Sequence, residues 1–456
     1  MFENIIDQGV IEQLKHDFVN AALPPSILFC GPIASAKGTT ALELARVLSC
    51  EASAIPNLEL SAAWSCRCDS CARHRTLSHP DLLVLGSRNF LGEICACRNV
   101  FLNDMQTAGT RTLFVRAVRK LLLRFSPIIW EGDPKISKWN PLVETIRDSL
   151  DELEAFFKDA KAPETTNKLE KLCDVIVNAC VALEAADGLT ANIPIAQIRH
   201  SSYWLRMSPN GRRKTLIIEN AEKMNDSARN SLLKILEEPP STATIVLTSA
   251  RPKAILATIT SRVRQYKFMR RSVESEIEVL KRIFKQNITD TCGENPILRF
   301  QSTFLPVSSE KLAQAAAFFW SSIAARTIVQ KRKKSGASLP VNQMIVTLGS
   351  FCAPIAVEGG FPKHESSVKA LVTPLCKNAA DFKPRSLFNL FMGSLYEMLS
   401  RPLREAPVTD AIRLRSMFKR HAETASSSVE TYNQSPQLAL ERLAVCLCND
   451  ICREFD

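Results

Sequence analysis

Residues 214–268 read KTLIIENAEKMNDSARNSLLKILEEPPSTATIVLTSARPKAILATITSRVRQYKF, and this stretch decides the fold. Residues 215–218 and 243–248 are short apolar runs of the length and composition of buried strands. An amphipathic helix lies between them, and residues 264–268 predict a third strand. Strand, helix and strand in this order predict a parallel sheet covered by helices. Sheets of this kind bind ligands at the carboxyl ends of their strands.

The helix in the middle of this stretch carries a specific motif. Residues 230–240 read NSLLKILEEPP, which is similar to the N-A-L-L-K-x-L-E-E-P-P motif in the clamp-loader branch of the AAA+ ATPases. Residues 261–263, SRV, resemble the S-R-C motif of the same family. A generic βαβ unit is the alternative, but an eleven-residue match placed after a strand is specific. The resemblance implies an α/β AAA+ P-loop module, a small helical lid and an all-α collar domain.

Length and composition set the limits of the interpretation. The chain has 456 residues, enough for two to four domains, and 46% of them are hydrophobic, so real cores are expected. The net charge of +11 is compatible with a polyanionic partner. No homeodomain, zinc-finger or RNA-recognition signature is present, so contact with DNA would not be sequence-specific.

The sequence also predicts a cellular compartment. The first ten residues, MFENIIDQGV, lack the basic and apolar regions of a secretory signal. We expect no apolar run of membrane-spanning length and therefore a cytoplasmic protein with no membrane partner. Most of the 15 cysteines should then be reduced, and a cluster of cysteines would bind a metal.

Residues 31–40 read GPIASAKGTT and lie between a predicted strand and a predicted helix, where a phosphate-binding loop belongs. Such a loop needs converging backbone N–H groups, a lysine that reaches the phosphates and a hydroxyl that binds Mg²⁺. Gly31 and Lys37 meet the first two demands. Gly38 stands where the serine or threonine should be, and Thr39 comes one residue too late on the helix.

A second defect lies at the end of the central strand. Glu219 and Asn220 take the place of the acidic pair that the resembled family carries there. An amide cannot polarise water as a carboxylate does, and Glu219 alone would bind Mg²⁺ loosely. Thr248 stands where the resemblance implies a sensor of the γ-phosphate. We expect a site that binds ATP and Mg²⁺ weakly or not at all, or a loop that only keeps its shape.

Arg262 is the residue of the S-R-V segment with a functional interpretation. The resemblance implies an arginine finger, contributed in trans to ATP bound by a neighbouring subunit. A guanidinium fork suits that role because it neutralises charge that develops on a transferred phosphoryl group. An arginine in a salt bridge at a strand entrance is the alternative.

Four cysteines indicate a metal site. Cys50, Cys66, Cys68 and Cys71 lie within residues 50–75, and thiolates bunched in a short polar loop suit tetrahedral Zn²⁺. Clamp-loader modules often carry a zinc loop at this point, although the spacing here is irregular. Four protein ligands would make the site structural, His74 is a spare ligand, and reduced cysteines without metal are the alternative.

About a hundred residues separate two motifs that the family keeps close together, HPD at 79–81 and IAQIR at 195–199. We interpret residues 91–192 as an inserted helical subdomain. Its segment 101–125 is basic and predicted to be helical, and would face DNA, an acidic partner or solvent. The other predicted domains are the nucleotide-binding-like module at 1–268, a helical lid at 269–294 and the collar or oligomerisation domain at 295–456.

The decayed site and the retained arginine resemble the delta-prime branch of the bacterial DNA polymerase III clamp loaders. The resemblance implies a hetero-oligomeric ring with gamma/tau and delta subunits, which loads the sliding clamp on primed DNA. Two alternatives remain open. One is a gamma/tau-like ATPase with weak activity, and the other is a scaffold protein on an inactive AAA+ fold.

Overall fold

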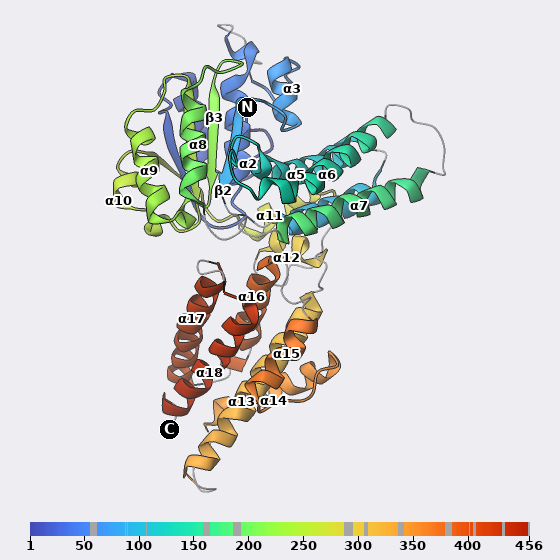
Figure 1. Ribbon diagram of the computed structural model, residues 1–456, viewed down its shortest axis with the longest axis vertical. Coiled ribbons are helices and arrows are strands. Elements are labelled where there is room, and N and C mark those ends of the chain that lie inside the picture. The colour runs from blue at the N-terminus through green and yellow to red at the C-terminus, as the bar shows by residue number, and fades with distance from the viewer. Residues whose placement is uncertain are drawn as a thin grey trace. The chain divides into compact units, whose positions relative to one another are not determined.

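The computed structural model describes residues 1–54, 62–86, 88, 90–105, 107–157, 165–185, 193–286, 295–304, 309–335, 342–378, 385–400, 402–404, 407–430 and 434–454. They form two compact units, Met1–Phe304 and Leu305–Asp456 (Figure 1). The first unit holds a β-sheet, whereas the described elements of the second are all helical.

The sheet of the first unit is parallel throughout, as the strand–helix–strand pattern predicts. Its order is β2-β3-β4-β1-β5, so β3 and β4 lie inside the sheet. The strands are β1 (Ser26–Cys30), β2 (Leu82–Gly86), β3 (Lys214–Glu219), β4 (Ala243–Ser249) and β5 (Arg264–Lys267). Every residue of β1, β3 and β4 is buried, which explains why these strands are continuous apolar runs in the sequence.

Helices α2 (Lys37–Ser49), α8 (Ile195–Arg206) and α9 (Asp226–Glu237) flank this sheet. Helix α2 packs against β3 and β4, and α8 packs against β3 and α9. Asn225 caps α9 by accepting a hydrogen bond from the Ala228 amide at 2.8 Å. The helix ends before the two prolines, as predicted. The other α-helices of the first unit that lie outside the segment between β2 and α8 are α1 (Val10–Val19), α3 (Asp69–Arg75), α10 (Ala257–Thr260), α11 (Val273–Arg282) and α12 (Pro296–Thr303).

Helices fill the described part of the segment between β2 and α8. They are α4 (Leu91–Asn103), α5 (Ala108–Leu122), the 3-10 turn η2 (Leu123–Phe125), α6 (Ile136–Phe156) and α7 (Thr165–Ala185). The prediction of a single helix at 101–125 is wrong, because the helix is interrupted between α4 and α5. Thr107 is extended there, and the Thr110 hydroxyl donates to the Asp104 carbonyl at 2.6 Å. Phe101 and Phe114 stack across the break at 6.0 Å, so the apolar spacing alone does not reveal it.

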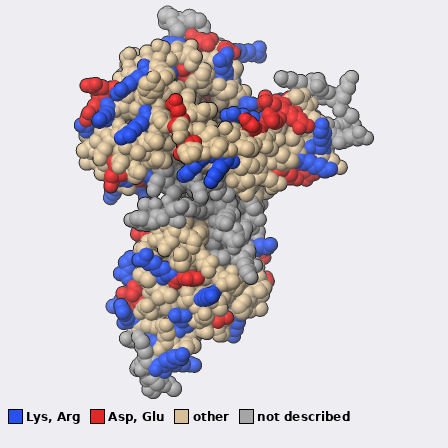
Figure 2. All heavy atoms as spheres, in the orientation of Figure 1, with Lys and Arg blue, Asp and Glu red and all other residues tan. Residues whose placement is uncertain are grey.

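The basic residues of α5 point into the first unit rather than to solvent or DNA. Lys120 pairs with Glu93, and Arg119 pairs with Glu154 at 2.9 Å. Arg116 donates to the His74 carbonyl at 3.2 Å. On the face drawn in Figure 2, Lys and Arg side chains lie among Asp and Glu side chains. The prediction of a solvated or DNA-facing basic helix is therefore wrong for these three residues.

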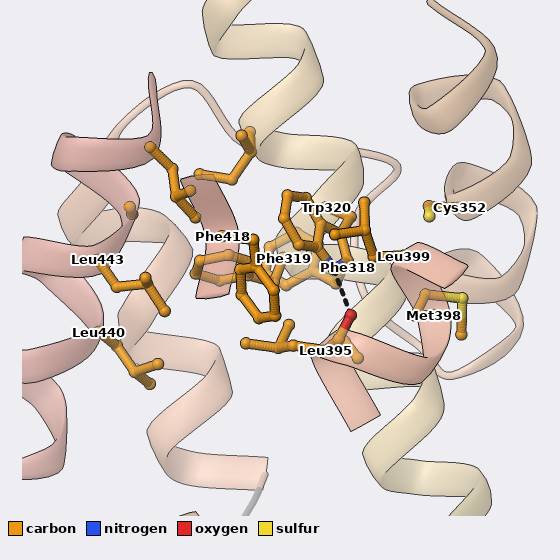
Figure 3. Close-up of a cluster of buried hydrophobic side chains, with 14 of the residues drawn as sticks. Phe318, Phe319, Trp320, Cys352, Leu395, Met398, Leu399, Phe418, Leu440 and Leu443 are labelled. Atoms are coloured by element: carbon orange, nitrogen blue, oxygen red, sulfur yellow. Dashed lines mark hydrogen bonds between the residues drawn. The ribbon is translucent and has the colours of Figure 1, made fainter. Parts of the chain in front are cut away.

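The second unit is a helical bundle around a core rich in aromatic residues. Trp320 is fully buried, and its indole N–H donates to the Leu395 carbonyl at 2.8 Å (Figure 3). The helices are α13 (Ser309–Ser335), α14 (Gln343–Glu358), α15 (Val368–Asn378), α16 (Arg385–Ser400), α17 (Val408–Glu430) and α18 (Pro436–Glu454), with the 3-10 turn η6 (Pro402–Arg404). Gly349 and Pro354 are residue types that commonly mark loops, yet both lie inside α14.

One expectation about apolar runs needs correction. Within α13, the segment Glu310–Lys333 is long and apolar enough to cross a membrane by length and composition. Two-thirds of its most apolar window is buried inside the protein. The core helix of a soluble bundle has the same composition, so this segment gives no support for a membrane span.

Candidate functional site

The phosphate-binding loop follows β1 and leads into α2. Ala34 and Ala36 adopt positive φ angles of 63° and 67°, and the loop keeps its bend although alanine replaces glycine at position 36. The ammonium of Lys37 donates to the Gly31 carbonyl at 2.7 Å, to the Ser35 hydroxyl at 3.2 Å and to the Pro32 carbonyl. Burial lowers the pKa of Lys37 to about 8. The lysine is therefore bonded back onto its own loop.

Glu219 ends β3 directly beneath this loop, and each of its carboxylate oxygens meets an arginine. Oε1 accepts from the Arg88 guanidinium at 3.3 Å, and Oε2 accepts from the guanidinium of Arg124 in η2. Glu219 and Arg124 are only 8% and 4% exposed. The position at which a Mg²⁺-binding carboxylate was predicted thus holds an internal ion pair.

Gly38 and Glu219 are in close contact. A Cβ atom at position 38 would lie 2.6 Å from Glu219 Oε1 and 3.6 Å from Arg88 Nη1. A serine or threonine there, the usual source of the Mg²⁺-binding hydroxyl, would collide with the carboxylate as it now lies. Thr39 is exposed, and the hydroxyl of Thr40 is buried and finds no hydrogen-bond partner among the residues that the structure describes. Neither hydroxyl replaces the missing ligand.

Asn220 and Thr248 lie together at the ends of β3 and β4. Asn220 has a positive φ of 53°, and its backbone N–H donates to the Thr248 hydroxyl at 3.2 Å. The structure brings the residues predicted to bind nucleotide and Mg²⁺ together at the carboxyl ends of the strands. As they lie, they do not fit MgATP, because Lys37 and Glu219 already have partners inside the protein.

Arg262 lies at the surface, after the short helix α10. Its guanidinium donates to the Thr258 carbonyl at 2.8 Å and pairs with Glu237, at the end of α9, at 2.7 Å. The side chains of Arg262 and Glu237 are 34% and 49% exposed, so this ion pair contributes little to stability. Arg262 is accessible, and the free-energy cost of exchanging Glu237 for another partner is small.

The predicted cysteine ligands come together. The sulfur atoms of Cys50, Cys66, Cys68 and Cys71 lie within 4.8 Å of one another, with Cys50 Sγ 3.7 Å from Cys66 Sγ and 4.0 Å from Cys68 Sγ. Tetrahedral Zn²⁺ with bonds of about 2.3 Å requires sulfur atoms about 3.8 Å apart. The four residues therefore fit a structural zinc ion. His74, the spare ligand, is not part of this group and stacks on another histidine, His79, at 4.1 Å.

The environment differs among the four cysteines, since burial raises the pKa of the Cys71 thiol. Burial opposes ionisation of Cys68, but hydrogen bonds led by the Cys71 amide lower its pKa to about 7. The Arg46 guanidinium donates to Cys71 Sγ at 3.1 Å. A metal bound by four thiolates carries net negative charge, and this arginine would offset part of it.

Sequence reasoning missed Arg88 and Arg124 as partners of the central carboxylate. Arg124 is 95 residues from Glu219 in the sequence, and it belongs to a segment that was interpreted as a separate helical insertion. Its basic neighbours on α5 gave no sign that this one cation is buried. Only the packing of η2 against β2 brings it to the end of β3.

Comparisons with known proteins identify relatives of the first unit. A family model described as DNA polymerase III, delta subunit, matches residues 157–272. This chain is related to the clamp-loader subunits of DNA polymerase III. Its parallel five-stranded sheet with flanking helices is an AAA+ α/β module with helical additions, as the motifs predicted.

Two curated proteins that are similar to this chain are DNA polymerase III subunits delta'. The one from Pseudomonas aeruginosa is 47% identical over 55 residues, which are 12% of this chain and 17% of that protein. The one from Buchnera aphidicola is 38% identical over 78 residues, which are 17% of this chain and 22% of that protein. The matched segments thus span about a fifth of these relatives' length.

A solved structure is also similar. It is a DNA polymerase III gamma-subunit-related protein from Thermotoga maritima, with 20% sequence identity and a TM-score of 0.27. The alignment covers 58% of this chain and 82% of that one.

Proposed function

We propose that this chain is a delta-prime-like subunit of a DNA polymerase III clamp loader. It does not hydrolyse ATP itself and donates Arg262 to ATP bound by a neighbouring subunit. Its partners are gamma/tau and delta subunits in a hetero-oligomeric ring in the cytoplasm, and the assembly opens the sliding clamp and loads it on primed DNA without reading the sequence.

One contrast carries this proposal. The groups that would serve ATP in this chain are engaged internally, since Lys37 binds its own loop and Glu219 binds two arginines. Arg262 is instead exposed and weakly held. A subunit with these features is suited to complete a neighbour's site rather than to run its own.

The remaining parts of the proposal concern metal and nucleotide. Zinc is the expected resident metal, held by the four cysteines in a site with no open position for catalysis. ATP and Mg²⁺ belong to the neighbouring subunit. The positively charged composition supports contact with DNA in the assembled complex through the phosphate backbone.

The test replaces Arg262 with alanine in a complex reconstituted with the partner subunits of the same organism. We expect ATP turnover at the adjoining site to fall by about a thousandfold, the typical contribution of an arginine finger. Arg206→Ala is the matched control, since Arg206 is an exposed arginine at the end of α8 in the same unit. It should leave the rate unchanged.

The two alternatives predict different outcomes of the same experiment. A gamma/tau-like ATPase would hydrolyse ATP as an isolated chain and lose that activity on Lys37→Ala. A scaffold on an inactive fold would give equal ATPase rates for the Arg262→Ala and Arg206→Ala complexes, or would not join the complex. Any of these results would contradict the proposed role.

A further inference from the structure

The carboxylate at the end of β3 has a permanent cationic partner within the chain. Arg124 contacts Glu219 Oε2 and Arg88 contacts Glu219 Oε1. Both guanidinium groups lie over the ring of Phe90, each with its central carbon 5.4 Å from the ring centroid. The aromatic face stabilises both cations and fixes their planes. The group is therefore organised around the carboxylate and is not a chance surface contact.

The backbone holds Arg124 in place. The Trp130 indole N–H donates to the Arg124 carbonyl at 2.6 Å, and η2 packs against β2. Arg88 is held from its other side by Glu93, which also accepts from Lys120 of α5. Five charged side chains from β3, the end of β2, α4, α5 and η2 thus form one continuous network.

Arg124 is costly where it lies. It is 4% exposed, and its Nε and Nη1 atoms have no hydrogen-bond partner in the described part of the chain. Burial lowers the pKa of Arg124 to about 10, against the opposing effect of Glu219. A buried guanidinium with open donors destabilises a fold unless it neutralises a buried charge. Glu219 is the carboxylate that it neutralises.

The network also occupies the space that a metal site would need. Glu219 Oε1 lies 2.6 Å from the position of a Cβ at residue 38, so the carboxylate fills the place of the missing hydroxyl side chain. The two arginines supply positive charge on the same carboxylate that would otherwise face Mg²⁺. The residues here therefore do not fit a divalent cation, because the cation's electrostatic role is already filled.

We propose that Arg124 and Arg88 replace a divalent cation as the permanent partner of Glu219, so that the α4–η2 segment closes the phosphate-binding module. This inference deepens the proposed loss of the nucleotide site, on which it rests. The module then keeps its folded shape without nucleotide or Mg²⁺. The helical segment after β2 acquires a role, which is to supply a built-in cation to the central strand.

The test uses the isolated full-length chain, with Mg²⁺ alone and MgATP as probes. Amide hydrogen exchange of β3 and the thermal midpoint of the first unit are measured for the wild type and for Arg88→Ala/Arg124→Ala. In the wild type, neither probe should change the amide exchange of β3 or the thermal midpoint. The double variant should lower the folding equilibrium constant by about a hundredfold or more, because a buried carboxylate loses both partners. Millimolar Mg²⁺ should recover part of that loss.

Controls separate charge from packing. Arg206→Ala removes an exposed arginine at the end of α8, and it should change the midpoint little. Adding Glu219→Gln to the double variant should abolish its response to Mg²⁺. If the double variant does not fold, the single variants Arg124→Lys and Arg124→Met decide. Lysine keeps a cation and should retain more protection of β3 than methionine, which keeps an unbranched side chain but is uncharged.

Three results would overturn the inference. They are a Mg²⁺-dependent response of the wild type to ATP, a double variant as stable as Arg206→Ala, and a Mg²⁺ response that survives Glu219→Gln. None of them involves the partner subunits. A complex in which Arg262→Ala has no effect would refute the proposed function and leave this network intact, so the two failures can be told apart.

Discussion

At the scale of single residues, Glu184 is the clearest case of an ionisable group that the fold removes from water. It is 3% exposed near the end of α7, and one oxygen accepts from the Phe90 amide at 3.2 Å. Its other oxygen has no hydrogen-bond partner among the described residues. Burial raises the pKa of Glu184 to about 7, and the Phe90 and Leu91 amides oppose that rise only in part. The protein therefore holds a carboxyl group that prefers to be protonated.

This shift predicts a pH dependence of stability. The pKa is higher in the folded than in the unfolded protein, so the folded state binds more protons between about pH 4.5 and pH 7. Stability from this group is present below that window and lost as the pH rises through it. Glu184→Gln should stabilise the first unit at pH 8 by up to about 3 kcal/mol and flatten this slope.

Urea unfolding at a series of pH values measures the effect. Glu170→Gln is the control, because Glu170 is an exposed residue of the same helix and should change neither the stability nor its slope. Equal slopes in the wild type and Glu184→Gln would contradict the assignment.

Residue-level predictions succeeded where the relevant neighbours are close in sequence. The approach of Cys66, Cys68 and Cys71 follows from their spacing, and Cys50 ends the preceding helix α2. The contact of Arg124 with Glu219 has no local signature, because it depends on how a helical insertion packs on the sheet. A basic residue that will be buried looks the same in the sequence as one that will be solvated.

At the scale of elements, the buried strands were predictable, whereas helix α14 and the break between α4 and α5 were not. Strands β1, β3 and β4 are buried on both faces, so their composition alone identifies them. Helix α14 contains Gly349 and Pro354, which are typical of loops. Packing in the second unit overrides that local preference, since Leu348 and Cys352 of α14 are buried in its core. Tertiary contacts decided this element.

The cysteine group joins two elements and predicts a dependence on metal. Cys50 ends α2 and Cys68 caps α3, so a bound ion would tie these helices together. We expect one zinc ion per chain in protein purified without chelator, and a lower thermal midpoint after its removal. Elemental analysis and thermal unfolding check this. Cys66→Ser should lose most of the zinc, because three ligands remain.

The control for this experiment is a cysteine outside the group. Cys446 of α18 is, like Cys66, neither buried nor fully exposed, and Cys446→Ser should keep the full zinc content. Protein that carries no zinc and unfolds at the same temperature with and without chelator would show that the thiols are simply reduced cysteines.

At the scale of the whole molecule, each compact unit has a core of its own. The core of the second unit is drawn from all six of its described α-helices, with Trp320 near its centre in edge contact with Phe418 at 5.1 Å (Figure 3). Of the five tryptophans in the chain, Trp320 alone belongs to this unit, so its emission reports on this core. A unit that buries its own apolar residues in this way can fold alone.

We therefore expect residues 305–456, expressed alone, to be helical and to unfold in one cooperative transition. Trp320 should emit at the short wavelength of a buried indole and shift to longer wavelength at the same midpoint at which helicity is lost. Trp320→Phe should destabilise this unit by about 1–3 kcal/mol, because it removes the indole hydrogen bond to the Leu395 carbonyl and leaves a cavity beside the smaller ring. Val408→Ala, at a residue that is 73% exposed, is the matched control and should change stability by less than about 0.5 kcal/mol. Non-coincident loss of helicity and tryptophan burial, or an exposed indole at the outset, would mean that this core needs the rest of the chain to form.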